Sequence, residues 1–185
     1  MTTAELIDAM FADIGATLRQ VDPEQIDALQ RAILSARRVF IAGKGRSGLQ
    51  MRAFAMRLMH LGLTAHVVDE VTTPAIEVGD LLLVGSSSGR TRSLVGAVEA
   101  LAGASVTLAA ICGNLDSPIA RAADCLVYIP ATNFKTDGSG DKSILVMGAL
   151  FEHCLGLCCD LLVIRLKAAL GVPEHEMNAR HANIE

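Results

Sequence analysis

The chain has 185 residues, of which 51% are hydrophobic and only 3% aromatic, and its formal net charge is −4. This length and apolar content predict one domain with a large core, while the few aromatic side chains and the acidic balance argue against a surface that binds DNA or RNA. No apolar run reaches the roughly 20 residues that a membrane span needs, and the acidic segment MTTAELIDAM is unlike a signal peptide. We therefore expect a cytoplasmic protein that binds neither nucleic acid nor a membrane, with its five cysteines as free thiols.

Two helices are predicted within residues 1–36. Apolar residues recur at helical spacing from Ile7 to Leu18 and again from Ile26 to Leu34. The second helix is expected to have Asp22 as its N-cap, followed by a proline at the first helical position.

From residue 38 onward, short apolar runs alternate with amphipathic segments. The runs are apolar throughout, which is typical of strands in a parallel sheet that helices cover on both faces. The predicted strands are residues 39–42, 65–68, 81–84, 106–111 and 126–129, and the predicted helices between them are residues 49–61, 92–101 and a short one from Ser117. This order predicts an α/β fold, a three-layer α-β-α sandwich with right-handed crossovers.

The C-terminal part begins with a polar, glycine-containing loop over residues 133–142. A long apolar helix is predicted from Ser143 to about Leu170, and a short last helix follows it. Apolar residues from Leu145 to Ile164 spread around the long helix, which predicts burial on all sides, in part by a second copy of the chain. We divide the single domain, residues 1–185, into N-terminal helices (1–36), an α/β core (37–131) and C-terminal helices (143–185).

Two glycine-rich loops follow predicted strands and open predicted helices, at residues 43–48 and 85–91. Glycines allow backbone N–H groups to approach an anion closely, at the positive end of a helix dipole. Both loops lie at the carboxyl ends of strands, where ligands bind in open α/β sheets. The two loops together predict a site for a phosphorylated small molecule.

The first loop also matches the G-x-G-x-x-G fingerprint of dinucleotide-binding proteins, and Asp69 lies where a ribose-binding acid would be expected. Against this interpretation, Arg46 places a bulky charged side chain in the loop, and the chain lacks a separate substrate domain. A nicotinamide-dependent oxidoreductase is therefore the less favoured alternative, and no cofactor is expected.

Several motifs together resemble the 6-phospho-3-hexuloisomerases, which belong to the sugar isomerase (SIS) domain family. These motifs are GKGRSG, RAFAMRLMHLG, TTPAIEVGDLLLVGSSSG, GALFEHC and the terminal RHANIE. The resemblance implies a five-stranded parallel sheet of flavodoxin-like order and a homotetramer. It also implies interconversion of 3-hexulose 6-phosphate with fructose 6-phosphate, in the ribulose monophosphate pathway of formaldehyde fixation.

The resemblance also implies roles for individual residues. Glu152 is expected to be the catalytic base, and His181 is expected to reach the active site of a neighbouring subunit. Residues of the two glycine-rich loops are expected to bind the substrate: Ser47, Ser86, Ser88 and Thr91 its phosphate, and Gly45 and Arg46 other parts of it.

The residues around Glu152 suit proton transfer between adjacent carbons through a cis-enediol, because a carboxylate within an apolar helix is a stronger base. A metal-assisted hydride shift would need clustered histidines and carboxylates, which the sequence lacks, so no metal is expected. Gly148 and Gly156 lie four residues on either side and are expected to leave a hollow over the carboxylate. The alternative is that Glu152 is a surface residue and the glycines are packing sites between helices.

The chain departs from the usual family pattern at several positions. Ser87 stands where the family usually has glycine, a residue that readily adopts a positive φ. Lys44 and Arg90 add positive charge beside the two glycine-rich loops. The segment 140–148 differs from the usual family segment, which contains Arg and Gln. Two alternatives to the hexuloisomerase therefore remain: an isomerase acting on another sugar phosphate, and a sugar-phosphate-sensing SIS module without catalysis, which would not need Glu152.

Overall fold

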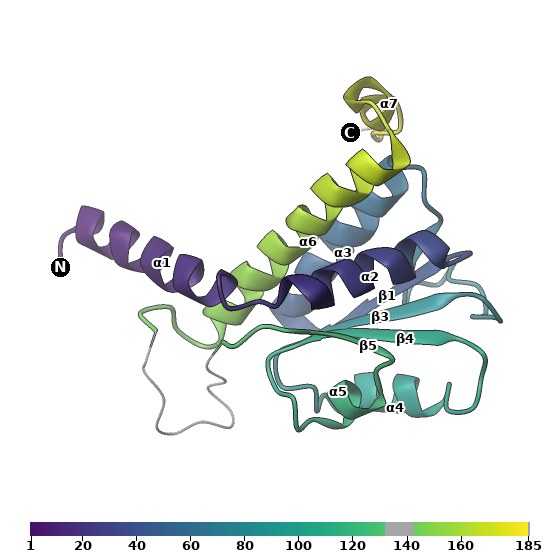
Figure 1. Ribbon diagram of the computed structural model, residues 1–185, viewed down its shortest axis with the longest axis horizontal. Helices are drawn as coiled ribbons and strands as arrows, with labels where there is room; N and C mark the ends of the chain where they lie inside the picture. The colour runs from purple at the N-terminus through teal and green to yellow at the C-terminus, as the bar shows by residue number, and fades with distance from the viewer. Residues whose placement is uncertain (132–142, 185) are drawn as a thin grey trace.

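The sheet of the computed structural model, which describes residues 1–131 and 143–184, has five parallel strands in the order β2-β1-β3-β4-β5 (Figure 1). The strands are β1 (Val39–Gly43), β2 (Ala65–Val67), β3 (Leu81–Ser86), β4 (Thr107–Cys112) and β5 (Cys125–Tyr128). This is the flavodoxin-like order, so the predicted fold class is confirmed. The loop predicted over residues 133–142 lies outside the described residues.

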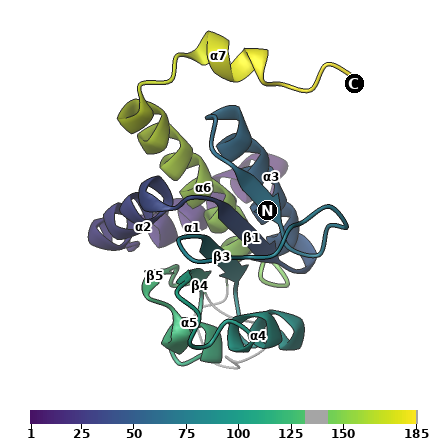
Figure 2. The same ribbon diagram turned by 90° about the vertical axis from the view of Figure 1, so that its right-hand side faces the viewer.

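Helices cover both faces of the sheet, which explains why the central strands are apolar throughout (Figure 2). One face carries α2 (Pro23–Ser35), α3 (Gly45–His60) and α6 (Ala149–Leu170), and the other carries α4 (Arg92–Glu99) and α5 (Pro118–Ala122). The remaining helices are α1 (Thr3–Leu18), which extends away from the sheet and packs on α6, and α7 (Glu174–Ala179) near the C-terminus (Figure 1).

The pairing of β1 with β3 brings the two glycine-rich loops together. The parallel register runs from Val39 opposite Leu81 to Gly43 opposite Gly85. Both strands therefore end at the same level, and the loops that follow them begin side by side. From β1 the chain adds β2 on one side of the sheet and then β3, β4 and β5 on the other side. The place between β1 and β3 is therefore a topological switch point, where open α/β sheets bind ligands.

The helix starts agree with the sequence prediction in part. Asp22 accepts a hydrogen bond from the Glu24 backbone N–H at 2.8 Å, and Pro23 is the first residue of α2, as predicted. In contrast, α3 begins at Gly45 rather than near residue 49, so part of the first glycine-rich loop forms the first turn of this helix.

The long C-terminal helix begins at Ala149, so the predicted start at Ser143 is wrong. Met147 and Gly148 have φ angles of 59° and 86°, in the left-handed region, which cannot continue a right-handed helix backward. The predicted burial on all sides is also incomplete in the single chain, because Leu157, Leu161 and Ile164 are exposed, the last by 66%.

All five cysteines are free thiols, and burial raises their pKa values. Desolvation raises the pKa of Cys112 to about 12, that of Cys154 to about 11 and that of Cys158 to about 12. The sequence-based expectation of free thiols is thus confirmed, although Cys125 is only half-buried. Within residues 1–131 and 143–184, no helix is long and apolar enough to cross a membrane.

A buried carboxylate, Asp80, joins the beginnings of β1 and β3. It accepts hydrogen bonds from Arg37 Nε at 3.2 Å, Arg38 Nε at 3.1 Å and the Glu77 backbone N–H at 2.8 Å, and its side chain is fully buried. The bond from Arg38 is the main cause that lowers the pKa of Asp80 well below its usual range, against the opposing effect of burial.

We predict that Asp80→Asn lowers the melting temperature at pH 7 by about 5 °C, because hydrogen bonds to a charged group are lost. The pKa of Asp80 is lower in the folded state, so its stabilisation is present above the unfolded pKa of about 3.9 and is lost as the pH falls towards the folded value. The difference between variant and wild type, measured by thermal unfolding, should therefore shrink below about pH 4. Asp116→Asn is the control, because its ion pair with Arg121 is exposed. An equal effect of the two substitutions would contradict the prediction.

Candidate functional site

A cavity of about 180 Å³ lies where the ends of β1 and β3 meet the beginnings of α3, α4 and α6. It brings together seven of the eight residues predicted for the site. These are Gly45, Arg46, Ser47, Ser86, Ser88, Thr91 and Glu152. The cavity is also lined by Lys44, Leu94 and Met147. The sequence could not reveal the place of Met147, because it depends on the left-handed turn before α6.

Glycines at the strand ends allow α3 to pack directly against the sheet. A Cβ atom added to Gly48 would lie 2.7 Å from the carbonyl oxygen of Gly43, and one added to Gly85 would lie 2.4 Å from Sδ of Met51. A side chain at Gly48 would collide with backbone, and one at Gly85 would displace the Met51 side chain. The first turn of α3 therefore starts at the end of β1 and faces the cavity.

The second glycine-rich loop is held in shape by its own serines. Ser86 Oγ accepts a hydrogen bond from the Gly89 N–H at 3.1 Å, and Ser88 Oγ accepts one from the Arg90 N–H at 3.3 Å. In the described structure, both serine O–H groups remain available to donate to a ligand. Ser87 does not have a positive φ, so the glycine that is usual at this position is not needed for the backbone conformation.

Three helices point uncapped N-terminal ends at the cavity. The N-caps of α3, α4 and α6 are Lys44, Thr91 and Gly148, and none of them makes a side-chain capping hydrogen bond. Among the other helices, α1, α2 and α5 are capped by the side chains of Thr2, Asp22 and Ser117, whereas the short α7, away from the cavity, also lacks a side-chain cap. The helices at the cavity therefore leave backbone N–H groups and the positive ends of their dipoles for a ligand. This arrangement favours an anion such as a phosphate group.

Glu152 lies in the first turn of α6, and its side chain is 15% exposed, so it is not the surface residue of the alternative interpretation. Its Oε2 atom is 3.0 Å from Nε of Arg46, whose side chain is 57% exposed. The two atoms are close enough for an ion pair, but the N–H bond of Arg46 does not point at Oε2 as a hydrogen bond requires. Oε2 is buried and accepts no hydrogen bond from the described residues. The Arg46 guanidinium therefore lies beside a carboxylate that is largely enclosed.

The glycines on either side of Glu152 do not form the predicted hollow. Gly148 precedes α6 as its N-cap, and a Cβ added to Gly156 would lie only 2.7 Å from Oε1 of Gln50 on α3. Gly156 is thus a close-packing site between two helices. The space beside Glu152 comes instead from the meeting of the two glycine-rich loops with α6.

His181 lies far from the cavity of its own chain. Its ring stacks on that of the buried His60 at a centroid distance of 5.3 Å, and Arg180 Nη1 donates a hydrogen bond to the His60 carbonyl at 2.9 Å. His60 is the last residue of α3, a helix of 16 residues and therefore about 24 Å long, whereas the cavity is at its first turn. A single chain does not bring His181 to its own Glu152.

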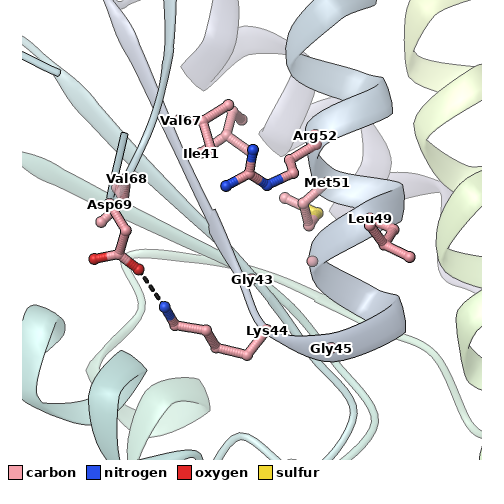
Figure 3. A pocket seen from close by; sticks show the side chains of 11 residues that line it. Ile41, Gly43, Lys44, Gly45, Leu49, Met51, Arg52, Val67, Val68 and Asp69 are labelled. Carbon is pink, nitrogen blue, oxygen red and sulfur yellow. Dashed lines mark hydrogen bonds and ion pairs between the residues drawn. The ribbon is translucent and has the colours of Figure 1, made fainter. Parts of the chain in front are cut away.

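A second cavity lies beside the first, between the beginning of α3 and the end of β2 (Figure 3). There Lys44 Nζ forms an ion pair with Asp69, the acid that a dinucleotide-binding protein would use for the ribose (Figure 3). This carboxylate is thus already engaged by a cation, which disfavours the dinucleotide interpretation. In the described part of the chain, no group of three His, Cys, Asp or Glu side chains is placed to hold a metal ion.

The chain is similar to known proteins over most of its length. Residues 32–152 match the SIS domain family. The chain belongs to this family. As an SIS domain protein, it is 46% identical over 173 residues to the 3-hexulose-6-phosphate isomerase of Mycobacterium gastri, covering 94% of this chain and 86% of the relative. It is 36% identical over 185 residues to the 3-hexulose-6-phosphate isomerase of Bacillus subtilis, covering 100% of both chains.

The same relationship holds for a solved structure. A crystal structure of a hypothetical protein from Methanococcus jannaschii has a TM-score of 0.84 and 31% identity, covering 98% of this SIS domain chain and 99% of the other. That structure was reported to infer a molecular function of 3-hexulose-6-phosphate isomerase. The family resemblance found in the sequence is therefore confirmed.

The serine loop provides a test of the phosphate site. We predict that Ser86→Ala and Ser88→Ala each raise the KM for fructose 6-phosphate by at least about tenfold, because a hydrogen bond to a charged group contributes about 1.5–3 kcal/mol. Initial rates and isothermal titration would measure the effect. Ser105→Ala is the control, because Ser105 is exposed next to the opposite ends of the strands. Unchanged KM in both test variants would mean that the phosphate binds elsewhere.

Proposed function

We propose that this protein is a 3-hexulose-6-phosphate isomerase that forms fructose 6-phosphate through a cis-enediol, with Glu152 as the base. The observation that carries the proposal is the meeting, in one cavity, of a carboxylate with the uncapped N-terminal ends of three helices. The carboxylate suits proton transfer, and the helix ends suit the phosphate group of a sugar phosphate. The identity to two curated isomerases of this name supports the choice of substrate.

In this mechanism the phosphate binds at the beginnings of α3 and α4, where Ser47, Ser86, Ser88 and Thr91 line the cavity. Glu152 then removes the proton from C2 of the 3-hexulose, and the electron pair forms the C2–C3 double bond of the enediol. The same carboxyl group returns a proton to C3, while the O2 proton leaves and O3 gains one, so that the carbonyl group moves from C3 to C2. Arg46 is close enough to Glu152 to balance the negative charge as it moves from the carboxylate to the enediolate oxygen.

The position of Glu152 favours an enzyme over a non-catalytic sensing module. A module that only binds a sugar phosphate needs the two loops but not a carboxylate, since a negative charge near the phosphate would oppose binding. Here Glu152 lines the phosphate-binding cavity and retains a buried oxygen that accepts no hydrogen bond from the described residues. A base held beside a cation in the substrate cavity fits this arrangement, whereas a sensor has no need of it.

The proposal extends to a homotetramer that shares its active sites, located in the cytoplasm and acting in the ribulose monophosphate pathway of formaldehyde fixation. Apolar side chains on α1 and α6, among them Phe11 and Ile164, are exposed in the single chain, and a second copy would bury them. His181, which cannot reach its own cavity, would serve the site of a neighbouring subunit.

We predict that Glu152→Gln abolishes turnover but preserves binding of fructose 6-phosphate, because the amide keeps the shape of the side chain and cannot accept the proton. NMR in D₂O would follow deuterium incorporation into fructose 6-phosphate, and calorimetry would measure binding. Glu99→Gln, an exposed position at the end of α4, is the matched control. A variant that keeps more than about a tenth of the wild-type kcat would show that Glu152 is not the base.

A separate prediction concerns the shared site. Removal of residues 180–185, or the substitution His181→Ala, should abolish activity without unfolding the protein, whereas the exposed control His175→Ala should remain active. Mixing the truncated protein with inactive Glu152→Gln should restore part of the activity, because a mixed oligomer contains sites with both residues intact. Sedimentation of a fully active monomer would exclude this assembly.

A further inference from the structure

Only two buried side-chain polar atoms in residues 1–131 and 143–184 have no hydrogen-bond partner, and both belong to residues that line the same cavity. They are Oε2 of Glu152 and Oγ of Ser87. The two residues come from different elements, the first turn of α6 and the loop after β3. Buried polar groups are rarely left unpaired, and an exception calls for a ligand, water or functional explanation. Glu152 Oε2 has an ion pair with Arg46 but Ser87 Oγ has no partner among the described residues, and both residues line the cavity where a substrate would bind.

Ser87 differs from the serines on either side of it. Ser86 and Ser88 each accept a backbone N–H within the loop and thereby shape it, whereas the Ser87 hydroxyl takes no part in the described hydrogen bonds of the loop. The backbone of Ser87 is held independently, since its carbonyl oxygen accepts the Gly113 N–H at 3.1 Å. The hydroxyl group is therefore dispensable for the shape of the loop.

The surroundings of Ser87 point to the part of the substrate that it contacts. A Cβ added to Gly113 would lie 3.0 Å from the Ser87 carbonyl oxygen and 3.2 Å from the ring of Phe151, the residue before Glu152. The Ser87 carbonyl and the Phe151 ring thus both lie against Gly113, which brings the backbone of Ser87 near the first turn of α6. The proposed phosphate ligands Ser47 and Thr91, in contrast, belong to the beginnings of α3 and α4.

We propose that Ser87 is a specificity-determining residue, whose hydroxyl group forms a hydrogen bond to a hydroxyl or carbonyl oxygen of the sugar carbon chain, next to the carbon that Glu152 deprotonates. This inference rests on the proposed isomerase function. A site that forms a hydrogen bond to a substrate oxygen discriminates against analogues without that oxygen, because the protein group is then left buried and unpaired. Ser87 thereby contributes to selection among sugar phosphates, a role distinct from holding the phosphate.

The substitution Ser87→Ala tests this role through three measurements. The kcat/KM for deuterium incorporation into fructose 6-phosphate should fall about tenfold, as for the loss of one hydrogen bond. The affinity for inorganic phosphate, measured by calorimetry, should not change. The melting temperature of the free protein should stay the same or rise, because an unpaired buried hydroxyl group is removed. Ser87→Gly should behave alike in kcat/KM and in phosphate affinity, since it also lacks the hydroxyl group.

Ser88→Ala is the comparison variant, because it should weaken the binding of inorganic phosphate and of fructose 6-phosphate together. Wild-type kcat/KM in both Ser87 variants would overturn the inference while leaving the isomerase intact. An equal loss of affinity for phosphate and for the sugar phosphate in Ser87→Ala would also overturn it, by placing Ser87 at the phosphate. A wild-type protein that incorporates no deuterium would overturn the proposed function together with this inference.

Discussion

The close contact between the end of β1 and the first turn of α3 positions most of the candidate site. Gly43 and Gly48 approach so closely that a Cβ on Gly48 would lie 2.7 Å from the Gly43 carbonyl oxygen. Any side chain there would push the helix away from the sheet and separate its N–H groups from the loop after β3. The candidate anion site therefore combines backbone atoms and helix ends with the side chains of Lys44 and Arg46. This explains how a chain with a net charge of −4 can offer a place for a phosphate.

The fold was predictable because its signals are local in the sequence. Residues 81–84 of β3 are buried on both faces of the sheet and are all apolar, and Asp22 with Pro23 marks a helix start without any tertiary information. The start of α6 was not predictable in this way. It depends on left-handed backbone angles at Met147 and Gly148, which the periodicity of apolar residues does not encode.

The candidate site could be predicted in its members but not in its contacts. Glycines and serines after two parallel strands had to meet at one edge of the sheet, and the structure brings them together. The ion pair of Arg46 with Glu152 and the packing of Gly156 against Gln50 depend instead on how α6 lies against α3. Such contacts depend on the tertiary arrangement. A sequence motif can therefore predict which residues belong to the site, but not which residues they contact.

The buried cysteines have a consequence for how the folded protein reacts with its chemical environment. Only a thiolate attacks electrophiles or enters disulfide exchange at an appreciable rate. Burial raises the pKa values of Cys112 and Cys158 to about 12 and that of Cys159 well above its usual value, so these sulfur atoms remain protonated at neutral pH. Aldehydes, alkylating agents and mild oxidants consequently find little reactive sulfur at these three positions in the native state, whereas Cys125 is only half-buried. A sudden gain in thiol labelling would report unfolding of the sheet and of α6, so the cysteines serve as internal probes of the integrity of the core.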